Sequence, residues 1–201
     1  MTRTRVLLAL ILCVCAVSSA RAGIVTFTDL DAFLAAAGDV HEIDFETLPD
    51  GSPSVGGTYL TPEFNYTDQG VTFSSPNDAP ALVGGEGNFI LQVGGPSEQR
   101  NWIIMDFVTP AFAVGVVYPG ITELSVFDAN GDLIGSALDT GPGADRFLGF
   151  LSDTPIARAM ADSGTSTEVI DSFLFTPVPE PTTALLVAVG AAALLRRGGV
   201  G

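Results

Sequence analysis

Carboxylate groups are the side chains of this sequence with the greatest capacity for chemistry. Residues 41–46 read His-Glu-Ile-Asp-Phe-Glu, so Glu42, Asp44 and Glu46 would share one face of a strand. Carboxylates packed this closely repel one another unless water solvates them or a cation bridges them. The cluster therefore predicts either a solvated acidic face or a site for Ca²⁺, a hard cation that prefers oxygen ligands.

Catalytic chemistry has less support. The single histidine, His41, has no second histidine with which to hold a zinc or iron ion, and both cysteines, Cys13 and Cys15, lie near the N-terminus. No G-x-S-x-G, phosphate-binding or dinucleotide-binding motif occurs in the sequence. Paired carboxylates can cleave glycosidic bonds, but among 23 Asp and Glu some pair always lies at a suitable separation. We therefore expect His41 to be an ordinary residue at a strand edge.

A second acidic cluster, Asp-Ala-Asn-Gly-Asp at residues 128–132, has the spacing with which a calcium loop begins. The rest of that pattern is absent, because Ser136, Ala137 and Leu138 occupy the region where a bidentate acid is needed. Asp, Asn and Gly are also the residues that a tight turn requires. We therefore expect a hairpin turn here.

Short strands are predicted to position these residues. Alternating or apolar runs separated by Gly, Pro, Asn and Asp cover residues 24–27, 41–46, 70–74, 88–93, 101–107, 111–118, 122–127, 133–138, 146–151, 156–161 and 168–175. One short helix is predicted at residues 29–37, with Thr28 as its N-cap and Gly38 as its stop. Many short strands with turn signals and a single helix indicate a mainly β fold, a single antiparallel β-sandwich of jelly-roll type.

This fold gives the acidic residues an arrangement in space. In a jelly roll the first and last strands often lie side by side, which would bring Glu46 close to Asp171 in the last strand. We expect these two carboxylates to be ligands of a calcium ion, with Asp44 as a third ligand. The alternative is that all three belong to a solvated face. Elsewhere, Gly115 is expected to let a neighbouring backbone come close to the strand at residues 111–118.

The N-terminus has the pattern of a secretory signal peptide. Arg3 and Arg5 precede an apolar run over residues 6–17, and a small-x-small triplet at residues 20–22 predicts cleavage before Gly23. Removal of residues 1–22 would take both cysteines with it, so the exported protein is expected to have neither a disulfide nor a catalytic thiol.

Residues 23–177 are then expected to form one domain. They carry 22 Asp and Glu against three arginines and no lysine, a formal net charge of −19. Such a charge repels nucleic acid and attracts cations, so we expect no nucleic-acid partner.

The C-terminus has three parts in order. Val178-Pro179-Glu180-Pro181 precedes an uncharged, largely apolar run at residues 182–195, and Arg196-Arg197 opens a basic tail at residues 196–201. Together, residues 178–201 resemble the PEP-CTERM sorting signal of Gram-negative bacteria, also labelled an ice-binding protein C-terminal domain. The resemblance implies export, transient anchoring in the inner membrane by a helix at 182–195, and processing near the Pro-Glu-Pro by an exosortase. The arginines would remain cytoplasmic by the positive-inside rule.

Residues 23–177 are similar to the small jelly-roll ectodomains often attached to this signal, some of them lectin-like or calcium-bearing. The matching segments are IDFETLPDG from Ile43, GVTFSS from Gly70, LSVFDANGDLIG from Leu124, FLGFLSD from Phe147 and IDSFLF from Ile170. The resemblance implies the fold. The export signals, the β-sandwich and the absence of catalytic motifs together predict a non-enzymatic protein of the cell surface or extracellular matrix, with an extracellular polysaccharide as partner. The alternative is a secreted glycoside-active enzyme that uses Asp and Glu.

Overall fold

The computed structural model describes residues 23–54, 57–76, 81–84, 91–94, 102–141, 143, 145–164 and 167–177. The predicted signal peptide at residues 1–22 and the predicted sorting signal at residues 178–201 lie outside these ranges. Within them, neither helix has the length and apolar character needed to cross a membrane.

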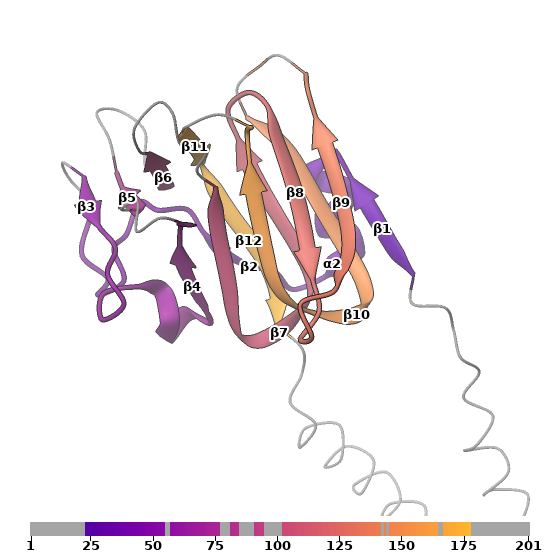
Figure 1. The fold of residues 1–201 in the computed structure, drawn as a ribbon, viewed down its shortest axis with the longest axis horizontal. Coiled ribbons are helices and arrows are strands. Elements are labelled where there is room, and N and C mark those ends of the chain that lie inside the picture. Colours follow the sequence, from indigo (N-terminus) through magenta and orange to yellow (C-terminus); the bar gives the residue numbers. More distant parts are fainter. Residues whose placement is uncertain are drawn as a thin grey trace, which may run out of the picture.

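The described chain is mainly antiparallel β-structure, as predicted (Figure 1). Its two helical elements are α2 (Leu30–Ala37) and the 3₁₀ turn η1 (Tyr66–Gln69). The strands are β1 (Ile24–Phe27), β2 (His41–Ile43), β3 (Thr58–Tyr59), β4 (Val71–Ser74), β5 (Ala81–Val83), β6 (Leu91–Gly94), β7 (Ile103–Tyr118), β8 (Thr122–Phe127), β9 (Leu133–Asp139), β10 (Arg146–Asp162), β11 (Thr167–Ile170) and β12 (Ser172–Pro177).

Two long strands, β7 and β10, pair with each other and organise the larger sheet. The first half of β7 also pairs with β4, and its second half pairs with β12. In β10 the first half also pairs with β1, and the second half pairs with β8, which in turn pairs with β9. The larger sheet therefore has a back part, β2-β12-β7-β10-β1, and a front part, β4-β7-β10-β8-β9. A smaller sheet has the order β11-β6-β5-β3.

Both long strands contain a proline where the front and back parts meet. The sequence predicts breaks at Pro110 and Pro155, with separate strands on each side, and this prediction is wrong. The β7–β10 register shifts between Leu151 and Ile156, so the ladder is interrupted at Pro155. Proline has no backbone N–H to donate. It is tolerated at this point because the ladder makes no hydrogen bond there. The prolines mark irregular points within continuous strands.

The front and back parts share one hydrophobic core. Val114 and Phe173 of the back part and Met105 and Val126 of the front part are completely buried in the same cluster. Aromatic rings fill much of it, and their edge-to-face and stacked pairs have centroids 5.4 to 5.9 Å apart. The sharing of one core by both parts makes the fold a jelly-roll-like β-sandwich.

The outer face of the back part is covered by α2, which lies behind the sheet in Figure 1. Phe33 of α2 is fully buried against Phe147, with ring centroids 5.0 Å apart. A Cβ added at Gly115 would lie 2.7 Å from the ring of Phe147. The absence of a side chain at Gly115 therefore leaves room for the ring of Phe147. The sequence led us to expect a neighbouring backbone at this position. The outer face of the front part has no helix on it among the described residues.

The helix itself begins one residue later than predicted. Asp29, and not Thr28, is the N-cap, because its side chain accepts the N–H of Ala32 at 2.8 Å. Gly38 ends the helix with a φ of +76°, as expected of a glycine stop.

Most other strand predictions agree with the structure to within a few residues. β1 and β8 have the predicted bounds, and β4 and β9 differ by one residue at one end. The predicted strand at 168–175 is divided at Asp171, whose N–H donates to the carbonyl of Val117 at 2.7 Å. The short strands β3 and β5 were not predicted.

Candidate binding site

The second strand of the larger sheet in chain order, β2, lies beside the last, β12, whereas the first, β1, pairs with β10. However, the prediction that Glu42, Asp44 and Glu46 share one strand face is wrong, because β2 ends at Ile43. Phe45 then adopts a φ of +57° and turns its ring into the core, where it is fully buried. Asp44 is exposed and its carboxylate accepts the N–H of Glu46 at 3.0 Å.

Asp171 is half-buried near acidic residues other than the predicted partners. Burial raises the pKa of Asp171, and the charges of Asp145 and Glu42 raise it further. Within the described part of the chain, no group of three His, Cys, Asp or Glu is arranged to hold a metal ion. Calcium binding by Glu46 and Asp171, with Asp44 as third ligand, stays a prediction.

That prediction has a direct test in thermal stability. If calcium binds only the folded protein, calcium at 100 times its dissociation constant is expected to add about 2.7 kcal/mol to the free energy of unfolding. Melting curves in EDTA, calcium and magnesium should then differ by about 6 to 11 °C in favour of calcium. An equal effect of magnesium, or a calcium response that survives Glu46→Gln and Asp171→Asn, would show a solvated acidic face.

The cluster at residues 128–132 forms the turn of the β8–β9 hairpin, as predicted. Asp128 accepts the N–H groups of Asn130 and Asp132 at 2.8 and 3.0 Å. The hydrogen bond from the Asp132 backbone is the main reason why the pKa of Asp128 lies below its ordinary value. The carboxylate holds its own turn, which is the usual role of Asp at such a position.

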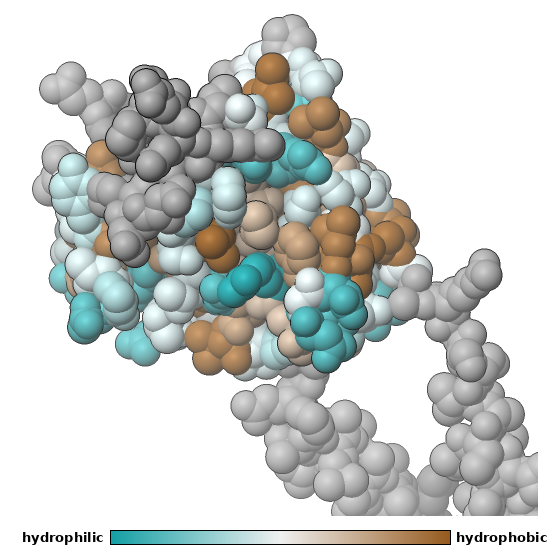
Figure 2. Space-filling model, viewed as in Figure 1, coloured by the Kyte–Doolittle hydropathy of each residue, from teal (hydrophilic) through white to brown (hydrophobic). Residues whose placement is uncertain are grey.

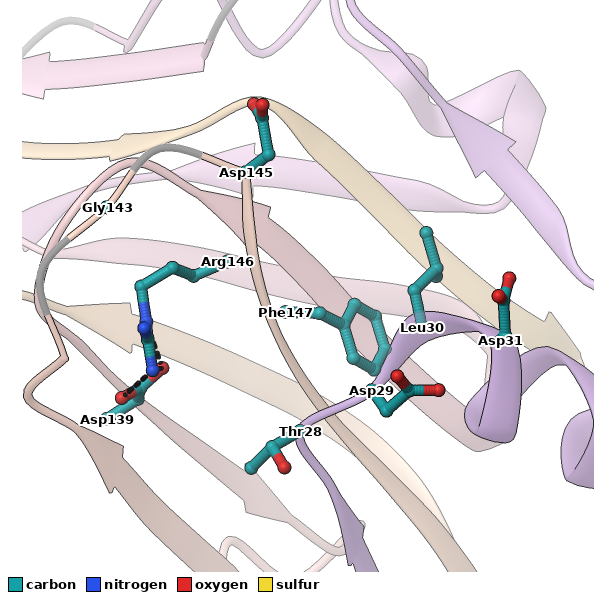
Figure 3. Close-up of a pocket in the computed structure, with 9 residues that line it drawn as sticks. All are labelled: Thr28, Asp29, Leu30, Asp31, Asp139, Gly143, Asp145, Arg146 and Phe147. Carbon is teal, nitrogen blue, oxygen red and sulfur yellow. Dashed lines mark hydrogen bonds and ion pairs between the residues drawn. The ribbon is translucent and has the colours of Figure 1, made fainter.

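A pocket of about 440 Å³ opens between the β9–β10 connection and the start of α2 (Figure 3). We call it the Arg146 pocket. It is lined by Thr28, Asp29, Leu30, Asp31, Asp139, Gly143, Asp145, Arg146 and Phe147. Figure 3 shows the side chains of Arg146 and Asp139 joined on one side and those of Leu30 and Phe147 on the other.

Arg146 is held in place by Asp139. The guanidinium donates from Nε to Oδ2 and from Nη2 to Oδ1, both at 2.5 Å, in a two-pronged ion pair. A Cβ at position 141 would collide with the guanidinium, so Gly141 permits this conformation. The Asp139 carboxylate also accepts the hydroxyl of Tyr118 at 2.6 Å and the N–H of Gly141 at 2.9 Å. A carboxylate has about four acceptor positions, so these four bonds fill Asp139, which acts as the support of Arg146.

The pKa values agree with this assignment. Burial alone would raise the pKa of Asp139, but the hydrogen bonds from Tyr118, Gly141 and Arg146 and the charge of Arg146 outweigh it, so the pKa is lowered. The pKa of Arg146 is raised, chiefly by its hydrogen bond to Asp139. Burial and then Asp139 raise the pKa of Tyr118 well above its usual value. Asp139 and Arg146 therefore keep their charges, and Tyr118 keeps its proton, across the physiological pH range.

The remaining polar groups of the Arg146 pocket are acceptors at its mouth. Asp29, Asp31 and Asp145 are exposed, and the structure gives none of them a salt bridge with a described residue. Thr28 adds an exposed hydroxyl. The pocket thus combines a fixed guanidinium, several acceptors and an apolar side.

A second pocket, of about 370 Å³, lies at the front part of the sheet beside the β8–β9 turn. We call it the Arg158 pocket. Arg158 and Asp106 are directly opposite each other on β10 and β7, and Arg158 Nε donates to Asp106 Oδ1 at 2.6 Å. Phe127 and Met160 supply apolar walls, and the turn residues 128–131 close one end.

His41 is exposed on the edge strand β2, with its Nε2 at 3.4 Å from Oε1 of Gln69, as expected for an ordinary strand-edge residue. The sequence reasoning missed both arginine–aspartate pairs. The available signal was the scarcity of positive charge: only three arginines occur between residues 23 and 177, and two of them are described here, each in an ion pair at a pocket.

The described residues thus form an antiparallel β-sandwich in which two of the pockets each contain an arginine–aspartate pair. No family model and no curated protein matches the sequence. Solved structures with some similarity include a mutant of the lectin binding domain of lectinolysin in complex with Lewis b. Its identity is 8%, the TM-score is 0.38, and 54% of this chain and 92% of that chain are covered. A fucose binding module from Streptococcus pneumoniae is 11% identical with a TM-score of 0.38, and 54% of this chain and 90% of that chain are covered. A mutant of the family 29 carbohydrate binding module CBM29-2 is 12% identical with a TM-score of 0.36, and 69% of this chain and 92% of that chain are covered. TM-scores this low support no inference about function.

Proposed function

We propose that this chain is an exported protein of the bacterial surface or extracellular matrix that binds polysaccharide at the Arg146 pocket and does not cleave it. The export signals and the PEP-CTERM-like ending support the location, and the pocket supports the ligand class. An exosortase-type enzyme would process the chain after transient anchoring in the inner membrane.

The single observation that carries the ligand class is the fixed geometry of Arg146. Asp139, Tyr118 and Gly141 hold the guanidinium before any ligand arrives, so binding would cost little side-chain ordering. Sugar hydroxyls both donate and accept hydrogen bonds. They can meet Arg146 as acceptors and the carboxylates of Asp31 and Asp145 as donors, while the apolar face of a sugar ring packs toward Leu30.

The enzymatic alternative lacks a matching feature. A glycosidase needs one carboxyl group that keeps its proton and can act as an acid beside the substrate. Among the described carboxyl groups, burial raises the pKa of Glu168 to about 7, and the pKa of Asp171 is also raised. Neither residue lines the Arg146 pocket or the Arg158 pocket. We therefore favour binding without turnover.

A glycan array tests the proposal if three proteins are compared. The wild-type protein is expected to bind at least one polysaccharide. Thr28→Trp is expected to weaken that binding at least tenfold, because the indole occupies the Arg146 pocket while both residues of the ion pair are kept. Thr67→Trp places the same ring at an exposed position in the pocket beside His41 and should bind as the wild type does. Equal loss in both variants, or none in Thr28→Trp, would place the glycan elsewhere.

The sorting part of the proposal is tested by the intact mass of the protein recovered from the surface or medium of its native host. The expected product begins at Gly23 and lacks Arg196 and Arg197. A recovered protein that retains residues 182–201 would contradict processing by cleavage.

A further inference from the structure

We propose that the Arg158 pocket is a second sugar-binding site, and that the protein is bivalent and cross-links polysaccharide chains. This inference rests on the proposed function, because it assumes that the Arg146 pocket binds the same class of ligand. It adds a second site and a consequence for the matrix.

The Arg158 pocket repeats the chemistry of the Arg146 pocket with unrelated residues. Arg158 and Asp106 are both well exposed, with 49% and 42% of their side-chain surfaces accessible, so a ligand can reach both members of the ion pair. The hydrogen bond that Arg158 donates to Asp106 is the main cause that raises the pKa of Arg158, and the guanidinium therefore stays charged. A charged donor beside a carboxylate acceptor matches a pair of neighbouring sugar hydroxyls.

The walls of the pocket are suited to the apolar face of a sugar ring. Phe127 and Met160 lie on neighbouring strands, β8 and β10, and both are partly exposed. An aromatic side chain and a thioether offer a polarizable, apolar surface beside the polar pair. The combination of one apolar wall and a few fixed polar groups distinguishes a binding site from a patch of surface charge.

The third side of the pocket is a turn with a fixed shape. Asp128 binds the backbone of Asn130 and Asp132 and also accepts from the side-chain amide of Asn130 at 3.2 Å. These bonds fix the turn that closes the pocket. This side of the Arg158 pocket is therefore organised before a ligand binds.

The Arg158 pocket has exposed residues at its edge, among them Ala129 and Asn130. Figure 2 views the protein from the side of β8 and β9, where hydrophilic and hydrophobic residues are interspersed. The polar residues include Ser125 and Ser136, whose hydroxyls lie 3.1 Å apart across the two strands. A polymer can therefore lie along the strands at this face, while α2 covers the opposite side of the sandwich.

The positions of the two pockets make simultaneous binding feasible. The Arg158 pocket lies at the turn before β9, and Asp139 of the Arg146 pocket is the last residue of β9. Seven residues of extended chain place the two sites roughly 20 Å apart. Two sites at that separation can hold two chains, and bivalent attachment to polymers strengthens binding far beyond either site alone.

The test measures stoichiometry and cross-linking in the full chain. Calorimetric titration would use trisaccharides of glucose, galactose, mannose and N-acetylglucosamine, and light scattering would use the corresponding polysaccharides. The wild-type protein is expected to bind two trisaccharides and to increase the scattering of the polymer. Thr28→Trp and Ala129→Trp, each of which fills one pocket, are expected to bind one trisaccharide and to lose the increase in scattering. Thr67→Trp is the matched control.

A second pair of substitutions guards against misfolding of the turn variant. Arg158→Gln with Asp106→Asn removes both charges of the ion pair together and is expected to give the same single-site titration. One bound trisaccharide in the wild type, or two in both Arg158-pocket variants, would overturn the second site and leave the proposed function standing. No binding by the wild type to any sugar or polysaccharide would overturn both.

Discussion

Replacing Glu168 by glutamine is expected to raise the free energy of unfolding by about 3 kcal/mol above pH 7 and to change it little below about pH 4. Glu168 on β11 is 1% exposed. Its Oε1 accepts the hydroxyl of Thr122 at 2.9 Å, and its Oε2 has no hydrogen-bond partner among the residues described. Burial raises the pKa of Glu168 to about 7, and the hydrogen bonds from Thr122 and Ser163 offset this only in part.

The direction of the pH dependence follows from proton binding. In the folded protein Glu168 keeps its proton up to about pH 7, whereas the unfolded chain releases it near its ordinary value of 4.5. The unfolded state thus binds fewer protons between pH 4.5 and 7, and stability falls as the pH rises through this window. Glutamine has nearly the same shape as protonated glutamate and carries no charge to bury. The Glu168→Gln variant therefore avoids this loss of stability as the pH rises.

Thermal melts of the wild type and Glu168→Gln at pH 5 and pH 8 measure the effect. The variant should melt about 6 to 12 °C higher at pH 8, and the gap should shrink toward pH 5. Glu123→Gln on β8 removes one charge from a partly exposed position and serves as the control, with an expected change within about 0.5 kcal/mol. A wild type that gains stability relative to Glu168→Gln as the pH rises would contradict the buried, protonated carboxyl.

Truncating Phe173 to alanine is expected to lower the free energy of unfolding by about 4 kcal/mol, the largest effect of any single change considered. Phe173 is fully buried on β12, and its ring contacts Phe73 edge-to-face at 5.5 Å. It also stacks on Phe107 and Phe175 at 5.9 and 5.6 Å. Removing the ring would leave a cavity between the front and back parts of the sheet, where rigid aromatic neighbours fill the space poorly.

Urea unfolding of Phe173→Ala and Leu138→Ala compares this site with an exposed one. Leu138 on β9 is 59% exposed, so its truncation should cost less than about 1 kcal/mol. If Phe173→Ala fails to fold, Phe173→Leu keeps most of the volume and should lose about 1 to 2 kcal/mol. A cost below 1 kcal/mol for Phe173→Ala would mean that the two parts of the sheet do not share this core.

The local parts of the fold were predictable because local sequence determines them. The alternation of Thr122 to Phe127 and the Asp-Ala-Asn-Gly turn after it specify a hairpin without reference to the rest of the chain. The same holds for α2, whose apolar spacing and terminal Gly38 are visible in the sequence. The N-cap was misassigned because Thr28 and Asp29 are adjacent and both are suitable caps.

The parts of the fold that depend on contacts between distant residues were not predictable, because local sequence does not determine those contacts. Pro110 and Pro155 are strand breakers by local rules, and only the change of pairing partners along β7 and β10 makes them tolerable. Phe45 interrupts an alternating acidic strand because its ring is drawn into a core built from distant residues, Tyr66 and Phe73. Burial of the ring contributes about 1.5 to 3 kcal/mol and offsets the cost of the left-handed backbone, which is about 1 to 3 kcal/mol.

The two pockets also combine features that local sequence determines with features that depend on distant residues. Asp139 and Arg146 flank a glycine-rich turn, so their pairing was within reach of the sequence. Their pocket also requires residues 28–31, which reach it only because α2 packs on the back of the sheet. The pairing of Arg158 with Asp106 spans 52 residues and depends on the register of β7 and β10, which no local pattern specifies.

Recovery of a polysaccharide after binding tests the central claim most directly. The wild-type protein would be incubated with the polysaccharide that it binds on the array, and the bound polymer would be eluted and its chain length compared with that of untreated polymer. Binding without turnover predicts that the polymer is retained by the protein and recovered at its original length. Shortened chains, with the shortening abolished by a single carboxylate-to-amide substitution, would contradict the account and establish a glycoside-active enzyme.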